Sequence, residues 1–270
     1  MFLCLHFGHN NPGHEYFLNS KTGPTSVIKC DNEKDLGVIF DTELKFDLHV
    51  NSVVNKANKV LGLIKRNFTD LDESSLVVLF KSLIRPLLEY GQPIWSPHLL
   101  KQSRLIENVQ RRATKLIHTI KDLPYRKRLE HLRLPSLKYR RLRGDLIQVY
   151  NLFKTDSFHT FFTLSTHDNT RGHDFKIYKK HSRTNTRKHS FSNRIVNTWN
   201  NLSHHTVNAQ DVDSFKKFLD GDLFNQLYIF DWFYKGQISH HVFIKILQPY
   251  GGDKKVIDYK KSQKSCNPVK

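Results

Sequence analysis

Helical periodicity constrains the fold of this chain more than any other feature of its sequence. From residue 47 onward, apolar side chains recur every three or four positions, which is typical of helices that bury one face. The first stripe predicts a helix that begins near Asp47 and buries Val50, Val53, Val54, Ala57, Leu61 and Ile64. The second runs from Leu76 to Leu88, and Pro86 is expected to bend that helix near its end because proline lacks a backbone N–H.

Two further helices are expected to carry many cations beside their apolar faces. The third is predicted over about residues 101–120, and its buried face comprises Leu105, Ile106, Val109, Ala113, Leu116, Ile117 and Ile120. The fourth is expected to begin at Ser136, whose side chain suits an N-cap, and to reach about Phe153. Its buried face comprises Leu142, Leu146, Val149, Tyr150 and Phe153. Residues 101–145 hold 14 Lys and Arg against four Asp and Glu, a net charge of +10.

The segments on either side of these helices have a different pattern. Residues 2–40 contain short apolar runs separated by turn residues, which predicts a small piece of β-sheet. Residues 156–190 are polar and basic, as in an extended arm or short hairpin, and short helices are expected at Ile195–Trp199 and Val212–Leu219. The predicted fold class is mainly α, a helical bundle preceded by a small β fragment and followed by a partly irregular basic region. We expect domains at residues 1–42, 43–155 and 156–221, with a tail of undetermined fold at 222–270.

A strong excess of positive charge points to a polyanionic partner. The 270 residues include 43 Lys and Arg but only 25 Asp and Glu, which gives a net charge of +18 with neutral histidines. Such a charge favours nucleic acid, although a basic surface can also serve only to keep a protein soluble. No apolar run approaches the roughly 18 residues needed to span a bilayer. The chain is therefore expected inside the cell, in the cytoplasm or nucleus, without a membrane partner.

The sequence shows no pattern of catalytic or metal-binding residues. Cys4, Cys30 and Cys266 are too scattered for a disulfide framework or a zinc site, and the 16 histidines are expected at the surface. We find no nucleophile–base pairing, phosphate-cradling glycine loop or metal-ligand spacing, and so expect no cofactor and no small-molecule substrate. Trp95 and Trp199 are expected to pack in the core and not to stack on bases.

Eight short strings resemble the jockey-like and related branches of the non-LTR (LINE-type) retrotransposon reverse transcriptases, in the order of that family, and the resemblance covers about residues 4–220. They are Glu33–Val38, Lys56–Gly62, Phe80–Gly91, Trp95–Pro97, Ile106–Lys115, Leu142–Ile147, Arg171–His173 and Phe191–Asn200. In the family the first is a palm hairpin called the primer grip, whose Leu-Gly turn approaches the primer end. The strings that follow belong to the helical thumb and the region after it.

The same resemblance implies that the chain has no polymerase chemistry of its own. Family members hold two magnesium ions with an early palm aspartate and an aromatic-Ala-Asp-Asp box, whereas this sequence contains no Asp-Asp pair. The segment Cys4–Gly8 resembles palm sequence that follows the box, so the chain is expected to start downstream of it. We therefore expect a mobile-element fragment of an RNA-directed DNA polymerase that is not an enzyme by itself, with magnesium needed only by the full-length enzyme.

Nucleic-acid binding is the activity that the resemblance leaves to this chain. A thumb must hold a template–primer duplex of RNA or DNA whatever its sequence, which calls for cations aimed at phosphates. The expected contact residues are Lys34, Leu36 and Gly37 in the primer grip, Arg104, Arg111, Arg112 and Lys115 on the third helix, Arg140, Arg141 and Arg143 on the fourth, and Arg171, Lys179 and Lys180 in the arm. The missing polymerase portion is a second expected partner. The alternative is a non-catalytic helical protein-interaction module or a repurposed DNA- or RNA-binding protein.

Overall fold

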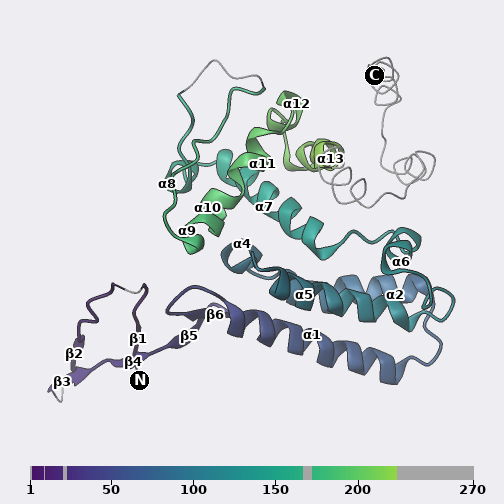
Figure 1. The fold of residues 1–270 in the computed structure, drawn as a ribbon, viewed down its shortest axis with the longest axis horizontal. Coiled ribbons are helices and arrows are strands. Elements are labelled where there is room, and N and C mark those ends of the chain that lie inside the picture. Colours follow the sequence, from purple (N-terminus) through teal and green to yellow (C-terminus); the bar gives the residue numbers. More distant parts are fainter. Residues whose placement is uncertain (1, 9, 21–22, 167–171, 224–270) are drawn as a thin grey trace, which may run out of the picture. The chain divides into compact units, whose positions relative to one another are not determined.

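Helices make up most of the structure, a computed structural model that describes residues 2–8, 10–20, 23–166 and 172–223. The described residues fall into two compact units, one formed by residues up to 166 together with 176–200, the other by 172–175 and 201–223 (Figure 1). The expected mainly α fold is therefore confirmed. The predicted tail at 222–270 lies outside the described residues except for its first two positions.

Short strands form the N-terminal region, as expected. Strand β1 (Leu3–Leu5) pairs in parallel with β4 (Ile28–Cys30), and β2 (Phe17–Ser20) pairs antiparallel with β3 (Gly23–Ser26). Strand β5 (Asn32–Asp35) pairs antiparallel with β6 (Val38–Asp41). The strands form three separate two-stranded ladders instead of one sheet. Two-stranded ladders have little stability of their own, so these depend on packing elsewhere.

The β5–β6 hairpin is the one of these ladders that is fixed to the helices. Its turn residues Leu36 and Gly37 both have positive φ, 43° and 87°, the combination that matches the twist of a tight hairpin. The Tyr90 hydroxyl donates to the Leu36 carbonyl at 2.9 Å, and Ile39 N donates to His49 Nδ1 at 3.2 Å. His49 is only 2% exposed, so the expectation of surface histidines is wrong there; burial lowers the pKa of this imidazole.

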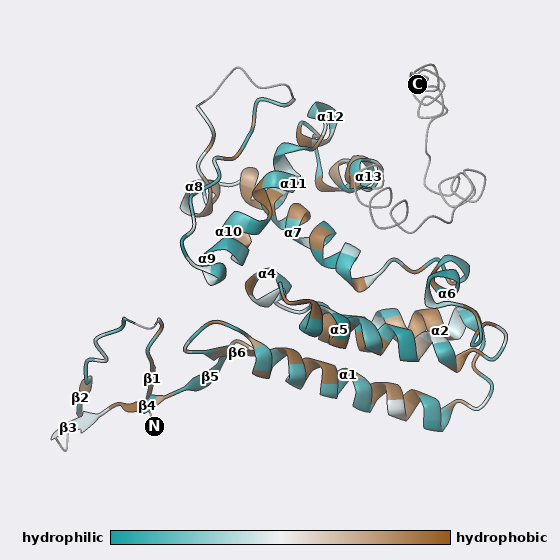
Figure 2. Cartoon of the chain, in the orientation of Figure 1, coloured by the Kyte–Doolittle hydropathy of each residue, from teal (hydrophilic) through white to brown (hydrophobic). Residues whose placement is uncertain are grey.

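Helix α1 (Asp47–Asn67) has the buried face that its periodicity predicts. It packs against α5 (Leu100–Ala113) and α3 (Arg85–Glu89). All six predicted apolar residues of α1 are buried, in one core with residues of the other helices. Figure 2 shows hydrophobic and hydrophilic residues alternating along α1, α5 and α7, as amphipathic packing requires.

The predicted bend at Pro86 takes the form of a widened turn before the proline. Helix α2 (Glu73–Leu79) continues through a π-helical segment, Phe80–Ile84, into α3. The N–H of Arg85 reaches the carbonyl of Phe80, five residues earlier. The proline ring has no N–H and crowds the carbonyl four residues before it. The wider turn accommodates the ring, so the helix continues from α2 into α3. The short helix α4 (Gln92–Trp95) follows and buries Trp95.

The third helix is shorter than expected because a buried guanidinium ends it. Helix α5 stops at Ala113, and a 3-10 turn, Thr114–Leu116, follows in place of the predicted helix to residue 120. Arg128 of α6 (Tyr125–His131) is 3% exposed and donates to Thr114 Oγ1 at 3.0 Å. It also donates to the carbonyls of Lys121, Leu123 and Arg111. A cation that binds the last carbonyls stabilises a helix end, and periodicity cannot reveal it.

Helix α7 (Leu137–Phe153) begins where predicted, since the Ser136 hydroxyl accepts from Tyr139 N at 3.2 Å. After it come α8 (Phe158–Phe161), α9 (Asn185–His189), α10 (Phe191–Arg194) and α11 (Val196–Asn200). Their core is aromatic: Trp199 contacts Phe153, and ring contacts continue from Phe153 to Phe158, Phe162 and Phe191 in that order. The second unit contains α12 (His204–Val207) and α13 (Val212–Leu223), with Asp211 capping α13.

A buried carboxylate joins three helices of the first unit. Asp145 of α7 is 2% exposed and accepts from two guanidinium nitrogens of Arg194 on α10, Nε at 2.9 Å and Nη2 at 3.0 Å. The amide of Gln92 on α4 donates to the same carboxylate at 2.8 Å. Arg194 also donates to the Pro93 carbonyl at 2.8 Å. Burial raises the pKa of Asp145 while Arg194 opposes that rise. We call Gln92, Asp145 and Arg194 the Asp145 network.

We predict that Asp145→Ala lowers the free energy of unfolding by about 3–5 kcal/mol, because it leaves the Arg194 guanidinium without its opposite charge and removes one acceptor of the Gln92 amide. Urea unfolding followed by circular dichroism measures this. The matched control is Asp213→Ala, which removes a carboxylate that is 89% exposed and paired with Lys216 on the surface. It should leave the midpoint almost unchanged. Equal effects of the two substitutions would contradict a structural role for the network.

Candidate nucleic-acid interface

Exposed cations follow one side of α5. They are Lys101, Arg104, Arg111 and Arg112 on the helix and Lys115 in the turn after it. At 3.6 residues per turn these positions fall within about 100° of the helix circumference and extend over roughly 20 Å. The buried Ile106 and Ala113 lie on the opposite side. We call these five residues the cationic stripe.

The acidic residue of α5 is directed away from the cationic stripe. The carboxylate of Glu107 accepts from the Tyr125 hydroxyl and from the backbone N–H of Leu137, at 2.5 and 3.1 Å. It therefore caps the start of α7, where the positive end of the helix dipole favours an anion. Tyr125 in turn lies under Arg111, whose guanidinium carbon is 4.4 Å from the ring centroid. The pKa of Tyr125 is raised, first by burial and then by Glu107.

Contrary to the expectation, Arg141 does not reach the surface. It is 4% exposed and donates to Ser103 Oγ of α5 at 2.9 Å. Burial lowers the pKa of its guanidinium, while Glu107 and Asp145 oppose the change. The position faces α5. The sequence predicted an exposed side chain there because Arg141 lies off the apolar stripe of its helix and arginine is rarely buried. Arg141 is therefore a structural residue, and a phosphate contact for it is ruled out in this conformation.

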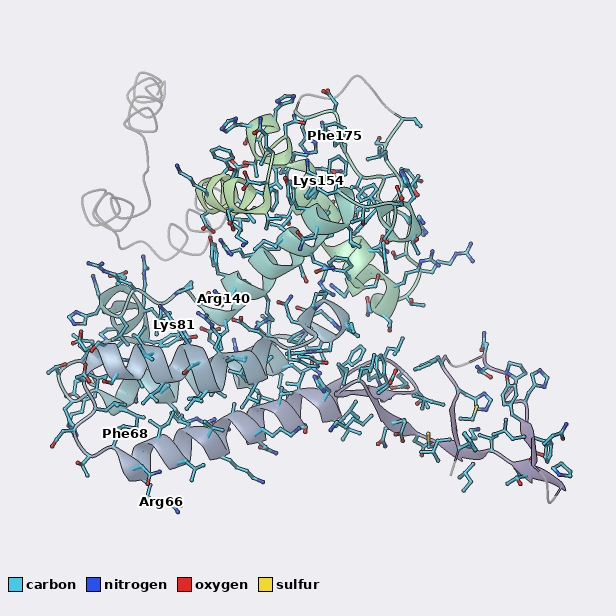
Figure 3. All side chains as sticks on the ribbon, turned by 180° about the vertical axis from the view of Figure 1, so that it is seen from behind. Arg66, Phe68, Lys81, Arg140, Lys154 and Phe175 are labelled. Atoms are coloured by element: carbon cyan, nitrogen blue, oxygen red, sulfur yellow. The ribbon has the colours of Figure 1, made fainter. Side chains whose placement is uncertain are left out.

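Arg140 and Arg143 line a shallow concavity between α4 and the first half of α7. Its other lining residues are Glu89, Gln92, Pro93, Gly144 and Ile147. Arg140 is paired with Glu89, with Nη2 to Oε2 at 2.8 Å, and Arg85 approaches the same carboxylate at 3.9 Å. Figure 3 labels Arg140 at this end of α7. Two guanidinium groups, those of Arg140 and Arg85, thus lie beside one acid, and the sequence alone did not indicate this sharing of Glu89.

The predicted primer-grip residues lie at the tip of the β5–β6 hairpin. Lys34 is exposed, and Leu36 is 84% exposed, which is unusual for a large apolar side chain. A side chain in place of Gly37 would put its Cβ 3.1 Å from Tyr90 Cε1, so glycine serves both the positive φ and the close packing. The structure brings these three residues together at one exposed turn.

The remaining predicted contact residues are those of the arm, and the two tryptophans were expected in the core. Arg171 lies outside the described residues. Lys179 and Lys180 are exposed, and Lys179 Nζ donates to Asn197 Oδ1 at 3.1 Å. Trp95 and Trp199 are 1% and 0% exposed, so the expectation that they pack in the core is confirmed. The sequence analysis missed Tyr178, an exposed aromatic residue beside Lys179.

A thiol–imidazole contact also escaped the sequence analysis. Cys4 Sγ lies 3.5 Å from His6 Nε2, and His6 Nδ1 lies 3.0 Å from Asn11 Oδ1. The signal was the spacing of two residues, which puts Cys4 and His6 on the same side of a strand. Elsewhere in the described ranges, no three His, Cys, Asp or Glu side chains are grouped so as to hold a metal ion.

Comparisons with known proteins add no relative. No family model, no curated protein and no solved structure matches the chain. Among the helices that the structure describes, none has the length and apolar composition needed to cross a membrane.

We predict that Glu89→Gln increases affinity for duplex nucleic acid. The substitution removes the carboxylate that pairs with Arg140, so one more cation becomes available to phosphate, and the slope of log K against log salt should steepen by about one unit. Fluorescence anisotropy with a blunt duplex at several salt concentrations measures both quantities. The control is Glu43→Gln, which removes one charge next to the exposed Lys45. If both variants gain equally, overall charge explains the gain and the concavity is no contact site.

Proposed function

We propose that this chain binds duplex nucleic acid through phosphates, without reading base sequence, as the thumb-like part of a non-LTR reverse transcriptase. The observation that supports this most strongly is the cationic stripe, five exposed cations on one side of a well-packed helix. The strings that resemble the family are a second, independent support. The activity proposed for this chain is holding a template–primer duplex, and the polymerisation chemistry lies elsewhere.

The geometry of the stripe suits a phosphate backbone better than base edges. Phosphates of one strand recur at short, regular intervals, and each cation that neutralises one releases a counterion whatever the base. The stripe places its five cations on one side of the helix over about four turns, so a single strand can contact several at once. Arg111 is held by its stacking on Tyr125, which limits the side-chain entropy lost on binding. The core beneath α5 keeps the stripe in register.

A second candidate function, docking onto another protein, is favoured by the N-terminal strands. The N-terminal segment that contains β1 to β4 leaves large apolar side chains exposed, in the strands and beside them. They include Phe2 at 68%, Phe7 at 46%, Tyr16 at 53%, Phe17 at 59% and Ile28 at 51%. Apolar groups concentrated on short ladders with open edges are typical of surfaces that pack against a partner. In the proposed context that partner is the remaining polymerase portion.

We predict that the purified chain does not extend a primed template with magnesium or manganese. Two-metal phosphoryl transfer needs carboxylates that hold both ions, and the sequence has no Asp-Asp pair to supply them. Incorporation of labelled nucleotide is the measurement, with a full-length reverse transcriptase as positive control. Incorporation above that of a mock purification would contradict the assignment of this chain to binding alone.

We predict that duplex binding weakens with salt and that the stripe accounts for the dependence. With about five phosphate contacts, log K should fall against log salt with a slope of about −4.5. The triple variant Arg104→Gln, Arg112→Gln, Lys115→Gln should flatten that slope by about 2 to 3 units at unchanged helical content. Duplexes of equal length and different sequence should bind alike.

The control for the stripe removes the same charge from another helix. Lys56, Lys59 and Lys65 are exposed cations of α1, and their joint replacement by Gln should change the slope much less. If the α1 variant flattens the slope as much as the stripe variant, binding is not centred on α5. A strong preference for one base sequence would instead favour a repurposed, site-specific binding protein.

A further inference from the structure

A second basic surface lies in the C-terminal part of the predicted arm, in residues 176–188. This segment contains six Lys and Arg and no Asp or Glu, and the next acid after Asp174 is Asp211. Among its exposed cations are Lys179, Lys180, Arg183, Arg187 and Lys188. We call this segment the basic arm. Its charge alone would suit any polyanion.

Tyr178 gives this surface a feature that the cationic stripe lacks. Its side chain is 53% exposed, and no described aromatic ring stacks on it. The ring of an exposed tyrosine among cations has an apolar surface whose hydration is unfavourable. A flat nucleobase can cover such a ring while the neighbouring cations contact phosphates on either side. In a blunt duplex the bases already stack on one another. An unpaired strand is therefore needed to offer a base face that can cover the ring.

The backbone holds Tyr178 rigidly in the position that stacking requires. Tyr178 N donates to the Thr163 carbonyl at 2.8 Å, and Ser165 N donates to the Lys176 carbonyl at 2.7 Å, in an antiparallel pairing centred on Leu164 and Ile177. Ile177 is 2% exposed. Side chains alternate along an extended segment, so the Tyr178 ring points away from the core that takes Ile177.

An amide side chain fixes the same segment to the helical part of the first unit. Asn200 at the end of α11 donates to the Ile177 carbonyl at 2.9 Å and accepts from Ile177 N at 2.8 Å. Lys179 is oriented by Asn197 of the same helix. A preorganised ring loses little entropy when a base stacks on it.

We propose that Tyr178 and the basic arm bind unpaired nucleic acid, with a base stacked on the Tyr178 ring and phosphates contacted by the flanking lysines. The inference extends the proposed function, because it adds a single-stranded site to the duplex site on α5. The chemistry that recognises the ligand is a base face beside a phosphodiester, without readout of base edges.

The test compares a blunt duplex with the same duplex carrying a single-stranded overhang of six nucleotides. The wild-type chain binds the overhang substrate more tightly. Tyr178→Ala weakens binding of that substrate about five- to tenfold and leaves blunt-duplex binding unchanged. Tyr178→Phe retains the affinity because the ring is kept. Because stacking is not ionic, the ratio of wild-type to Tyr178→Ala affinity stays constant as salt rises.

The matched control is Phe68→Ala, which removes an aromatic ring that is 46% exposed, at the C-cap of α1. It leaves both affinities unchanged. The inference is overturned if Tyr178→Ala has no effect, if it weakens both substrates equally, or if Tyr178→Phe loses as much as Tyr178→Ala. Absence of blunt-duplex binding by the wild-type chain overturns the proposed function instead. The single-stranded site is then tested separately, by the effect of Tyr178→Ala on binding of the overhang substrate.

Discussion

The buried charge of Asp145 is the constraint on which the packing of α4, α7, α10 and α11 depends. A carboxylate removed from water is costly unless hydrogen bonds and an opposite charge compensate for the lost hydration. Arg194 and Gln92 supply both. Each comes from a different helix, so α4, α7 and α10 are held in one arrangement. The close approach also needs Gly144, because a side chain there would bring its Cβ to 3.1 Å from Gln92 Oε1.

This network gives a physical reason for the strings that resemble the reverse transcriptases. Asp145 lies in Leu142–Ile147, Arg194 in Phe191–Asn200, and Gln92 directly after Phe80–Gly91. Tyr90 lies in Phe80–Gly91, and its hydroxyl donates to the carbonyl of Leu36 in the hairpin turn, which belongs to Glu33–Val38. Residues far apart in the sequence therefore contact one another in the structure. Their role in this structure is to hold elements in place.

Helical faces could be predicted from the sequence because burial leaves a periodic record. The six apolar residues of α1 and the Ser136 cap are examples, and both are confirmed. The end of α5 and the burial of Arg141 could not be predicted, because both depend on a guanidinium that meets partners distant in sequence. A pattern of residue types treats every arginine as a solvent-facing cation. Only the contacts separate those that hold the fold from those that remain exposed.

That separation changes how the positive charge of residues 101–145 should be interpreted. Arg128 and Arg141 are buried, Arg140 is paired with Glu89, and Lys127 is paired with Glu130. The exposed charge is thus smaller than the sequence total, and the cationic stripe supplies five of the exposed cations. A cation already bound to carbonyls or carboxylates contributes to stability and little to a ligand, whereas an exposed cation on a rigid helix can exchange its counterion for a phosphate.

The same reasoning links the Asp145 network to the basic arm. Arg194 ends α10, and α11 follows directly with Asn197 and Asn200, which hold Lys179 and Ile177. The position of Tyr178 therefore depends on α11, which the Asp145–Arg194 pair connects to α7. The cationic stripe depends instead on the core between α1, α3 and α5. The two basic surfaces rest on different interactions, so disturbing the network affects the tyrosine surface before it affects the stripe.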